Sequence, residues 1–148
     1  MRHPPIAELR VELQETGTWR LLRLSSGVLL PRLQRVLLTA LGWFKADGWR
    51  FEAAHLCYGM PNETAECADA ATVRLRHILP DTGTEATFVV TLDRVEYRHR
   101  LTVDRLLTPN VALRDAVCLS GAGTVPARHA RALGFDVRVT NVELARLR

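Results

Sequence analysis

One long segment, Val28 to Phe44, has the apolar spacing of an amphipathic helix and constrains the fold more than any other part of the chain. Its apolar residues recur at intervals of three and four, and they are Leu33, Val36, Leu37, Ala40, Leu41 and Phe44. These side chains would line one helix face, which has to be buried. Pro31 fits the first helical turn, and Gly42 fits a helix end. Because the neighbouring segments alternate like strands, we expect a sheet to cover this face.

The segments around this helix alternate apolar and polar residues, as strands with one exposed face do. Strands are expected at residues 7–13, 19–24, 49–57, 87–92 and 95–106. Short helices are expected at residues 73–79, 126–133 and 141–148, with a long loop at 58–72 and a flexible glycine-rich turn at 120–123. The sequence therefore predicts one α+β domain, residues 1–148, in which a mixed, mostly antiparallel sheet packs on one main helix. The opening ββαβ order would suit a β-grasp-like core, with short C-terminal helices after it.

The composition indicates a folded domain, because 47% of the 148 residues are hydrophobic. No apolar run approaches the roughly eighteen residues that span a bilayer, and the N-terminus lacks the apolar core of a secretion signal. We therefore expect a cytoplasmic protein that makes no membrane contact.

The three cysteines, Cys57, Cys67 and Cys118, are widely spaced and form no CxxC pair. Disulfide frameworks and closed zinc sites both use clustered cysteines. We therefore expect three free thiols that behave as small hydrophobic residues, and we expect no metal and no cofactor.

The chain is basic, with a net charge of +4 and a pI near 9.5 that come from nineteen arginines and one lysine. The candidate contacts for DNA or RNA phosphates are Arg94, Arg98, Arg100, Arg105, Arg128, His129 and Arg131. They would form one patch if the short helix at residues 126–133 packs near the rim of the strand at residues 95–106. The alternative is a solvated face on which these arginines pair with Glu96, Asp93 or Asp104.

His55 and His99 lie on the apolar faces of their expected strands, which favours hydrogen-bonded core histidines over metal ligands or general bases. If the two strands are neighbours, His55, His99 and Cys57 could converge on a weak metal site. Ser120 lacks both a nucleophile-elbow pattern and a paired base, so it carries no catalytic prediction. Trp19, Trp43 and Trp49 are expected to anchor the core.

The order of several motifs resembles that of the plasmid pRiA open-reading-frame-three-like family, whose members are often labelled transposon passenger or TnpR-like proteins. The matching motifs are LRVEL, TWRLLRL, LLPRLQRVLLTALGW, YGMP, VRLRHILPDTG, YRHRLTVDRLL, CLSGAG and GFDVRVTNVELARL. The resemblance is nearly end to end, and the helix that ends in Gly-Trp is its most specific part. It implies a fold more than an activity.

This chain departs from that family where the family has histidines, aspartates and a cysteine. A His-Leu-His-type pair is replaced by residues 47–49, an aspartate-rich turn by residues 92–99, and a Cys-Pro-acidic run by residues 124–130. If relatives use those side chains as a metal or catalytic site, this chain has lost most of it. We therefore expect a non-catalytic accessory or binding protein. The alternatives are a degenerate enzyme or metal-binding relative that uses His55 and His99, and a protein-interaction or self-association module that uses a sheet edge.

Overall fold

The chain folds as an α+β domain, which we describe from a computed structural model for residues 3–60, 66–109, 113–132 and 134–147. The strands are β1 Ile6–Leu13, β2 Trp19–Ser25, β3 Gly48–Ala53, β4 Leu56–Gly59, β5 Ala68–Asp69, β6 Glu85–Leu92, β7 Val95–Leu107 and β8 Val117–Ala122. The helices are α1 Leu30–Leu41, α2 Leu75–Ile78 and α3 Val137–Ala145, with short 3₁₀ turns η1 Ala70–Thr72 and η2 Ala127–His129. This arrangement confirms the predicted fold class.

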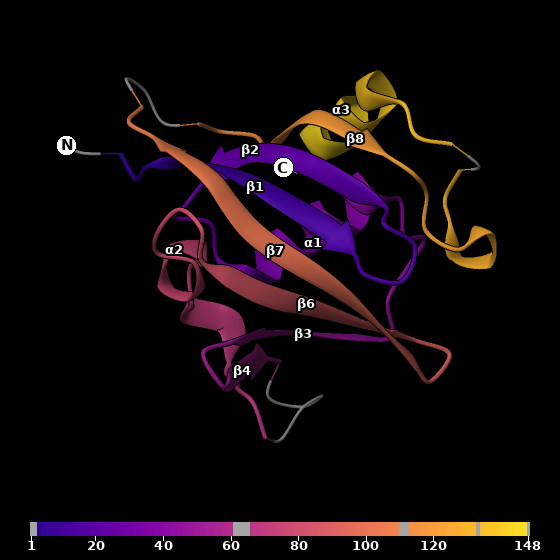
Figure 1. Cartoon of the computed structure of the whole chain (residues 1–148), viewed down its shortest axis with the longest axis horizontal. Coiled ribbons are helices and arrows are strands. Elements are labelled where there is room, and N and C mark those ends of the chain that lie inside the picture. Colours follow the sequence, from indigo (N-terminus) through magenta and orange to yellow (C-terminus); the bar gives the residue numbers. More distant parts are fainter. Residues whose placement is uncertain (1–2, 61–65, 110–112, 133, 148) are drawn as a thin grey trace.

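The described strands form one sheet in the order β5-β4-β3-β6-β7-β1-β2-β8 (Figure 1). All neighbouring strands are antiparallel except β4 and β5, which are parallel. Both predicted hairpins are present, as β1–β2 and β6–β7. The N-terminal hairpin lies between β7 and β8, so strands from the start of the chain pair on both sides with strands from its second half.

Helix α1 packs its apolar side against one face of the sheet, as its spacing predicts. Its buried residues are Leu30, Leu33, Val36, Leu37, Ala40 and Leu41. Gly42 ends the helix in the left-handed region at φ 86°, which glycine adopts without strain, and its N–H bonds the carbonyls of Leu38 and Thr39. Phe44 was predicted on the buried face, but it lies beyond this end and is 71% exposed.

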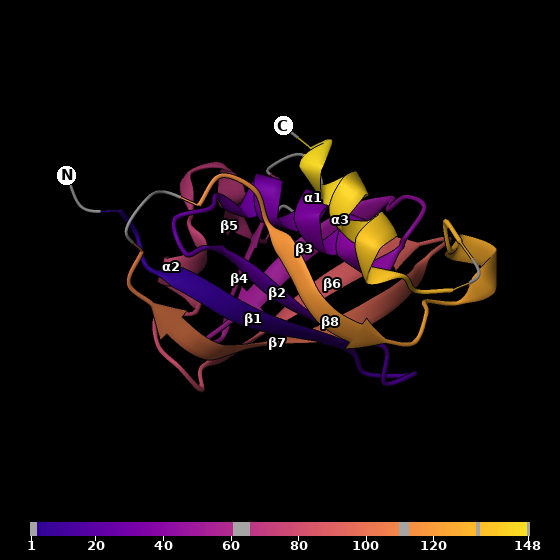
Figure 2. The same ribbon diagram turned by 90° about the horizontal axis from the view of Figure 1, so that it is seen from above.

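Helices α1 and α3 lie on the same side of the sheet, and the opposite face has no helix over it among the described residues (Figure 2). We call that open side the outer face. The core therefore lies between α1 and the inward residues of the central strands, such as Leu9, Leu22 and Leu101. No helix of the described residues is long and apolar enough to cross a membrane.

The third strand is shorter than predicted, because the chain turns at Ala54 and His55. Both residues have positive φ angles, of 48° and 68°, and they connect β3 to β4 in an antiparallel pair. The expected long loop at 58–72 is also wrong in part, since it contains the end of β4, then β5 and η1. Residues 61–65 of that loop lie outside the described residues.

The prediction of three free cysteines is wrong, because Cys57 and Cys67 form a disulfide with a Cα–Cα distance of 4.8 Å. The sequence spacing gave no signal for this bond. The two residues meet because β5 returns parallel to β4, which sequence periodicity does not show. Cys118 remains a free, buried thiol, as expected.

The C-terminal part of the chain differs most from its prediction. Ser120 to Ala122 belong to strand β8 and form no flexible turn. Within the predicted helix at 126–133 only η2 is helical, and Leu133 lies outside the described residues. The last helix begins earlier than expected, at Val137, because the Asp136 carboxylate accepts hydrogen bonds from the first backbone N–H groups.

Helix α3 covers the edge of the sheet at β8. The Asn141 amide oxygen accepts a 2.7 Å hydrogen bond from the Cys118 N–H, and its amide nitrogen donates a 3.0 Å bond to the Cys118 carbonyl. One side chain thus satisfies both backbone groups that a further strand would pair with. This contact works against the use of the β8 edge by a partner at that residue.

The three tryptophans have different positions. Trp43 is 2% exposed and belongs to the core, and Trp49 packs against the core while half-buried, so both serve as anchors. Trp19 was predicted to be a core anchor, but it lies half-buried opposite Glu12 on the outer face, with the Arg10 guanidinium 4.3 Å from its ring centre. The strand alternation places Arg20, and not Trp19, on the inner side.

Candidate functional site

Three of the predicted nucleic-acid contacts, Arg98, Arg100 and Arg105, lie along β7. Arg98 forms an ion pair with Glu52 on β3, and its second nitrogen is 3.7 Å from Glu96. Arg105 donates to both carboxylate oxygens of Glu8, at 2.9 and 3.0 Å. Arg105 is therefore paired with a residue of the neighbouring strand β1, and Arg98 reaches across β6 to a residue of β3, while Arg100 is exposed.

The outer face carries further pairs of opposite charge. Arg50 reaches Glu96 at 2.7 Å and Glu52 at 2.9 Å. Glu8 also accepts a 2.7 Å hydrogen bond from Arg23, and the hydrogen bonds from Arg105 and Arg23 lower the pKa of Glu8 to about 2. Carboxylates thus neutralise much of the positive charge on this face.

The remaining predicted contacts, Arg94, Arg128, His129 and Arg131, lie around η2 and the β6–β7 turn. The two segments are close, because His129 Nε2 is 3.7 Å from a carboxylate oxygen of Asp93. A hydrogen bond to Tyr97 raises the pKa of Arg128, and Arg131 pairs with Glu143 at 3.2 Å. His129 is only 9% exposed, so it is part of the packing and is poorly placed to reach a polyanion.

His99 is a core histidine, as its position on the apolar side of β7 predicts. Its Nδ1 lies 2.9 Å from the Phe88 carbonyl oxygen, and the Trp43 indole N–H donates to its Nε2 at 3.1 Å. Because the indole only donates, Nε2 must be the acceptor and Nδ1 must carry the proton. Burial lowers the pKa of His99 to about 4. Both ring nitrogens are thus occupied by structural partners, and neither is available to a metal or a substrate.

His55 was predicted on the buried face of a strand, but it is exposed in the β3–β4 turn. The turn at positive φ reverses the chain before the predicted strand could place His55 inside. His99, in contrast, is fully buried in β7. Among the described residues, no group of three or more His, Cys, Asp or Glu side chains could hold a metal ion.

A second group of arginines, which sequence reasoning missed, gathers at the N-terminal end of α1. We call it the α1 arginine cluster, and its members are Arg32, Arg35, Arg74, Arg76 and Arg114. Within the described parts of the chain, none of the five forms an ion pair with a carboxylate. Within the described residues this cluster therefore holds positive charge without an ion-pair partner, although Asp115 lines the same hollow as Arg32 and Arg114.

Gly27 is the point around which this cluster assembles. Arg74 donates to the Gly27 carbonyl, and the backbone N–H of Arg76 donates to the carbonyl of Ser26 at 2.9 Å. Arg32 and Arg114 line a hollow of about 180 Å³ together with Gly27. Arg35 follows Arg32 by three residues, so both lie on one side of α1. That spacing is visible in the sequence, but the approach of Arg74 and Arg114 depends on the fold.

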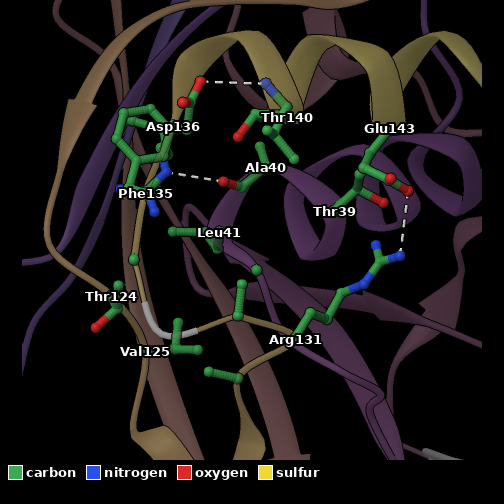
Figure 3. Close-up of a pocket in the computed structure, with 16 residues that line it drawn as sticks. Thr39, Ala40, Leu41, Thr124, Val125, Arg131, Phe135, Asp136, Thr140 and Glu143 are labelled. Atoms are coloured by element: carbon green, nitrogen blue, oxygen red, sulfur yellow. Dashed lines mark hydrogen bonds and ion pairs between the residues drawn. The ribbon is translucent and has the colours of Figure 1, made fainter.

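A cavity of about 450 Å³ opens at the opposite, C-terminal end of α1 (Figure 3). Its walls include Leu41 and Val125, and Phe135 lies on the other side of the cavity from the Arg131–Glu143 ion pair (Figure 3). The buried guanidinium of Arg20 forms a further part of the lining. The cavity thus combines apolar walls with one buried charge.

Among the described residues, the acceptors of the Arg20 hydrogen bonds are all backbone carbonyls. Its guanidinium donates to Ala40 at 2.8 Å, Trp19 at 2.7 Å, Ala122 at 3.1 Å and Gly123 at 3.0 Å. The Ala40 carbonyl belongs to the last turn of α1, where the helix dipole favours a cation. Burial lowers the pKa of Arg20 to about 10, so the group still carries its charge at neutral pH. Sequence reasoning missed this residue, because an arginine among apolar neighbours in a strand has no distinctive pattern.

Comparison with known proteins identifies the family but supplies no activity. No curated protein matches the chain. A crystal structure of a protein of unknown function from Methanosarcina mazei Go1 has a similar fold, with a TM-score of 0.70, 12% sequence identity, and coverage of 83% of this chain and 73% of that chain. The model of the plasmid pRiA4b ORF-3-like protein family matches residues 5–134. The chain therefore belongs to the plasmid pRiA4b ORF-3-like family.

Proposed function

We propose that this protein is a non-catalytic binding protein that contacts the phosphates of DNA or RNA through its arginines. The observation that carries the proposal is the α1 arginine cluster, whose five guanidinium groups pair with no carboxylate among the described residues. Arginine binds phosphate strongly and often with two parallel hydrogen bonds. A surface of this kind would hold the backbone of a nucleic acid without reading its bases.

The unpaired state of the cluster favours it over the outer face as the contact surface. Arg98 and Arg105 would have to leave Glu52 and Glu8 before they could bind a phosphate, and those carboxylates would then repel it. Arg35, Arg76 and Arg114 have no such partner in the described parts of the chain, and all three are exposed. The first turn of α1 contains no acidic residue, so its positive dipole end adds to the same field.

The proposal also fits the plasmid origin that the family description names, since a plasmid-encoded accessory protein would work beside nucleic acid. It places the protein in the cytoplasm for the same reason. It requires no cofactor and assigns no catalytic residue.

The test compares two triple variants that remove the same charge from different surfaces. The first is Arg35→Gln, Arg76→Gln and Arg114→Gln in the α1 arginine cluster, and it keeps Arg74 and Arg32 because their side chains donate to the carbonyls of Gly27 and Leu147. The matched control is Arg98→Gln, Arg100→Gln and Arg105→Gln on the outer face. Binding to short single- and double-stranded DNA and RNA is measured by fluorescence anisotropy at about 50 mM and about 200 mM salt.

We expect salt-sensitive binding by the unaltered protein, which the cluster variant weakens and the outer-face variant largely keeps. Each lost phosphate contact should reduce the slope of log affinity against log salt by about 0.9, so three contacts reduce it by about 2.7. Loss of binding in the outer-face variant alone would move the interface to the arginines along β7. No binding at the lower salt concentration would overturn the nucleic-acid function itself.

A further inference from the structure

The cavity at the C-terminal end of α1 contains one charged side chain, Arg20, that forms no ion pair with a carboxylate of the described residues. Four residues with formal charge line it: Arg20, Arg131, Asp136 and Glu143. Arg131 and Glu143 pair with each other, and Asp136 caps α3 by accepting hydrogen bonds from the N–H groups of Arg138 and Val139. Within the described parts of the chain, the hydrogen bonds of Arg20 all go to neutral carbonyls.

One hydrogen-bond donor of the Arg20 guanidinium also has no acceptor among the described residues. A guanidinium group has five N–H donors, and the four hydrogen bonds of Arg20 leave one N–H of Nη2 without an acceptor among the described residues. The residue is 2% exposed, so this charged group is largely buried. A buried, charged donor without a partner costs free energy that an acceptor from a ligand would recover.

The walls around Arg20 are suited to an organic body. The Phe135 ring lies over the guanidinium with 3.8 Å between the guanidinium carbon and the ring centre. Leu41, Val125 and Val139 supply apolar surface, and the volume of about 450 Å³ falls in the range of small-molecule sites. Because the carboxylates of Asp136 and Glu143 also line the cavity, a ligand with several negative charges would be repelled.

We propose that this cavity binds a small organic monocarboxylate, whose single carboxylate meets the free N–H of Arg20 and whose apolar body lies against Phe135, Leu41 and Val125. One negative charge balances Arg20 without excess repulsion from the two acidic side chains. An uncharged analogue of the same size would gain the apolar contacts but would leave the charge of Arg20 unbalanced. This inference is independent of the nucleic-acid proposal, because the α1 arginine cluster lies at the other end of the helix.

The test uses benzoate and hexanoate as probes, with benzyl alcohol and hexanol as their uncharged counterparts. Ligand-observed NMR and thermal unfolding are measured on the full chain over a millimolar range of each probe. We expect both carboxylates to bind saturably and to raise the unfolding temperature. Each alcohol should bind at least about tenfold more weakly than its carboxylate, since the loss of a hydrogen bond between charged groups weakens affinity by about that factor.

Two substitutions on one helix separate the cavity from the surface around it. Val139 and Val142 are 58% and 52% exposed on α3, but only Val139 lines the cavity. Val139→Trp should obstruct the cavity and abolish carboxylate binding, whereas Val142→Trp should bind as the unaltered protein does. Both positions are at the surface, so the larger ring should not prevent folding.

A substitution of Arg20 itself tests the charge. Arg20→Gln should remove the preference for carboxylate over alcohol, but it also removes the ties to Ala40 and Gly123 and could unfold the domain. If it does not fold, the Val139→Trp and Val142→Trp pair decides the question. The inference is wrong if neither carboxylate binds saturably, if the alcohols bind as well as the acids, or if Val139→Trp binds like Val142→Trp.

Discussion

Acid should destabilise this domain through one buried histidine, His99. Its Nε2 accepts the Trp43 indole hydrogen, and its Nδ1–H donates to the Phe88 carbonyl. A proton added to Nε2 would face the indole hydrogen and would break that bond. His99 is also buried, and burial disfavours the charged imidazolium, so the pKa of His99 falls from the ordinary 6.5 to about 4 and the ring stays neutral in the folded state.

The sign and size of the effect follow from this lowered pKa. Between pH 6.5 and pH 4 the unfolded chain binds a proton at His99 that the folded chain does not bind. The free energy of unfolding therefore falls as the pH falls through this window. The difference between the two pKa values corresponds to about 3 kcal/mol at the acid end, as an order of magnitude.

The perturbation is His99→Gln, which cannot titrate. At pH 7 it should lower the free energy of unfolding by about 1–3 kcal/mol, because glutamine cannot reproduce both hydrogen bonds in the same space. The gap between the two proteins should close as the pH approaches 4, since only the unaltered protein loses the contribution of His99. Urea unfolding followed by tryptophan fluorescence measures both curves.

His55→Gln is the matched control, because His55 is exposed in the β3–β4 turn and its replacement leaves the Trp43–His99–Phe88 chain intact. That variant should follow the unaltered protein across the whole pH range. A stability gap for His99→Gln that stays constant from pH 7 to pH 4 would refute the reasoning. It would mean that His99 accepts a proton in the folded state as easily as in the unfolded chain.

Three further substitutions test other parts of the fold. Glu8→Gln should lower the free energy of unfolding by about 1–2 kcal/mol at pH 7 and by little at pH 2. Because the pKa of Glu8 is lowered in the folded protein, its ion pairs stabilise the fold above pH 4.5, and this stabilisation is lost as the pH falls through about 2. Glu12→Gln on the same strand face is the control, and equal pH profiles of the two variants in chemical denaturation would contradict this. Asn141→Ala should lower the free energy of unfolding by about 1–3 kcal/mol, because it leaves the backbone N–H and carbonyl of Cys118 without their partner. The exposed edge of β8 should then promote self-association, which analytical ultracentrifugation measures. A variant that stays monomeric and as stable as the unaltered protein would show that these two hydrogen bonds are dispensable. Gly121→Ala should lower the free energy of unfolding by about 1–3 kcal/mol, seen as a lower unfolding temperature, since a Cβ there would lie 2.7 Å from both the Trp19 carbonyl oxygen and Arg20 Cδ. Gly48→Ala is the control, because a Cβ at Gly48 meets open space, and it should lower the unfolding temperature less.

The parts of the fold that could be predicted are those with a long, clean period. Helix α1 carries apolar residues at every third or fourth place, and β7 alternates over its whole length, so both were found with nearly correct bounds. The β3–β4 turn was missed because Ala54 and His55, which adopt the positive φ angles there, include no Gly, Pro, Asn or Asp, the residues that usually mark a turn. Strand β8 was missed because its Ser-Gly-Ala end has the composition of a turn.

The candidate sites were harder to predict, because they depend on which strands and loops are neighbours. The pairing of Arg105 with Glu8 joins β7 to β1, and nothing in either segment alone indicates the other. The same holds for Arg20, whose acceptors come from α1, β2 and the end of β8. A local pattern can nominate a charged residue, but the fold decides whether a carboxylate or a carbonyl faces it.

The position of the N-terminal hairpin inside the sheet, between β7 and β8, has a consequence for folding kinetics. Strands β1 and β2 and helix α1 are local in sequence and can form early, as can the hairpin β6–β7. The two parts of the sheet meet where β1 pairs with β7, across much of the chain length. Closing so long a loop is slow, so we expect this pairing to be the rate-limiting event. Until β7 is in place, the apolar side of the first hairpin stays open to non-native partners, which makes the β1–β7 pairing the step that a chaperone would protect.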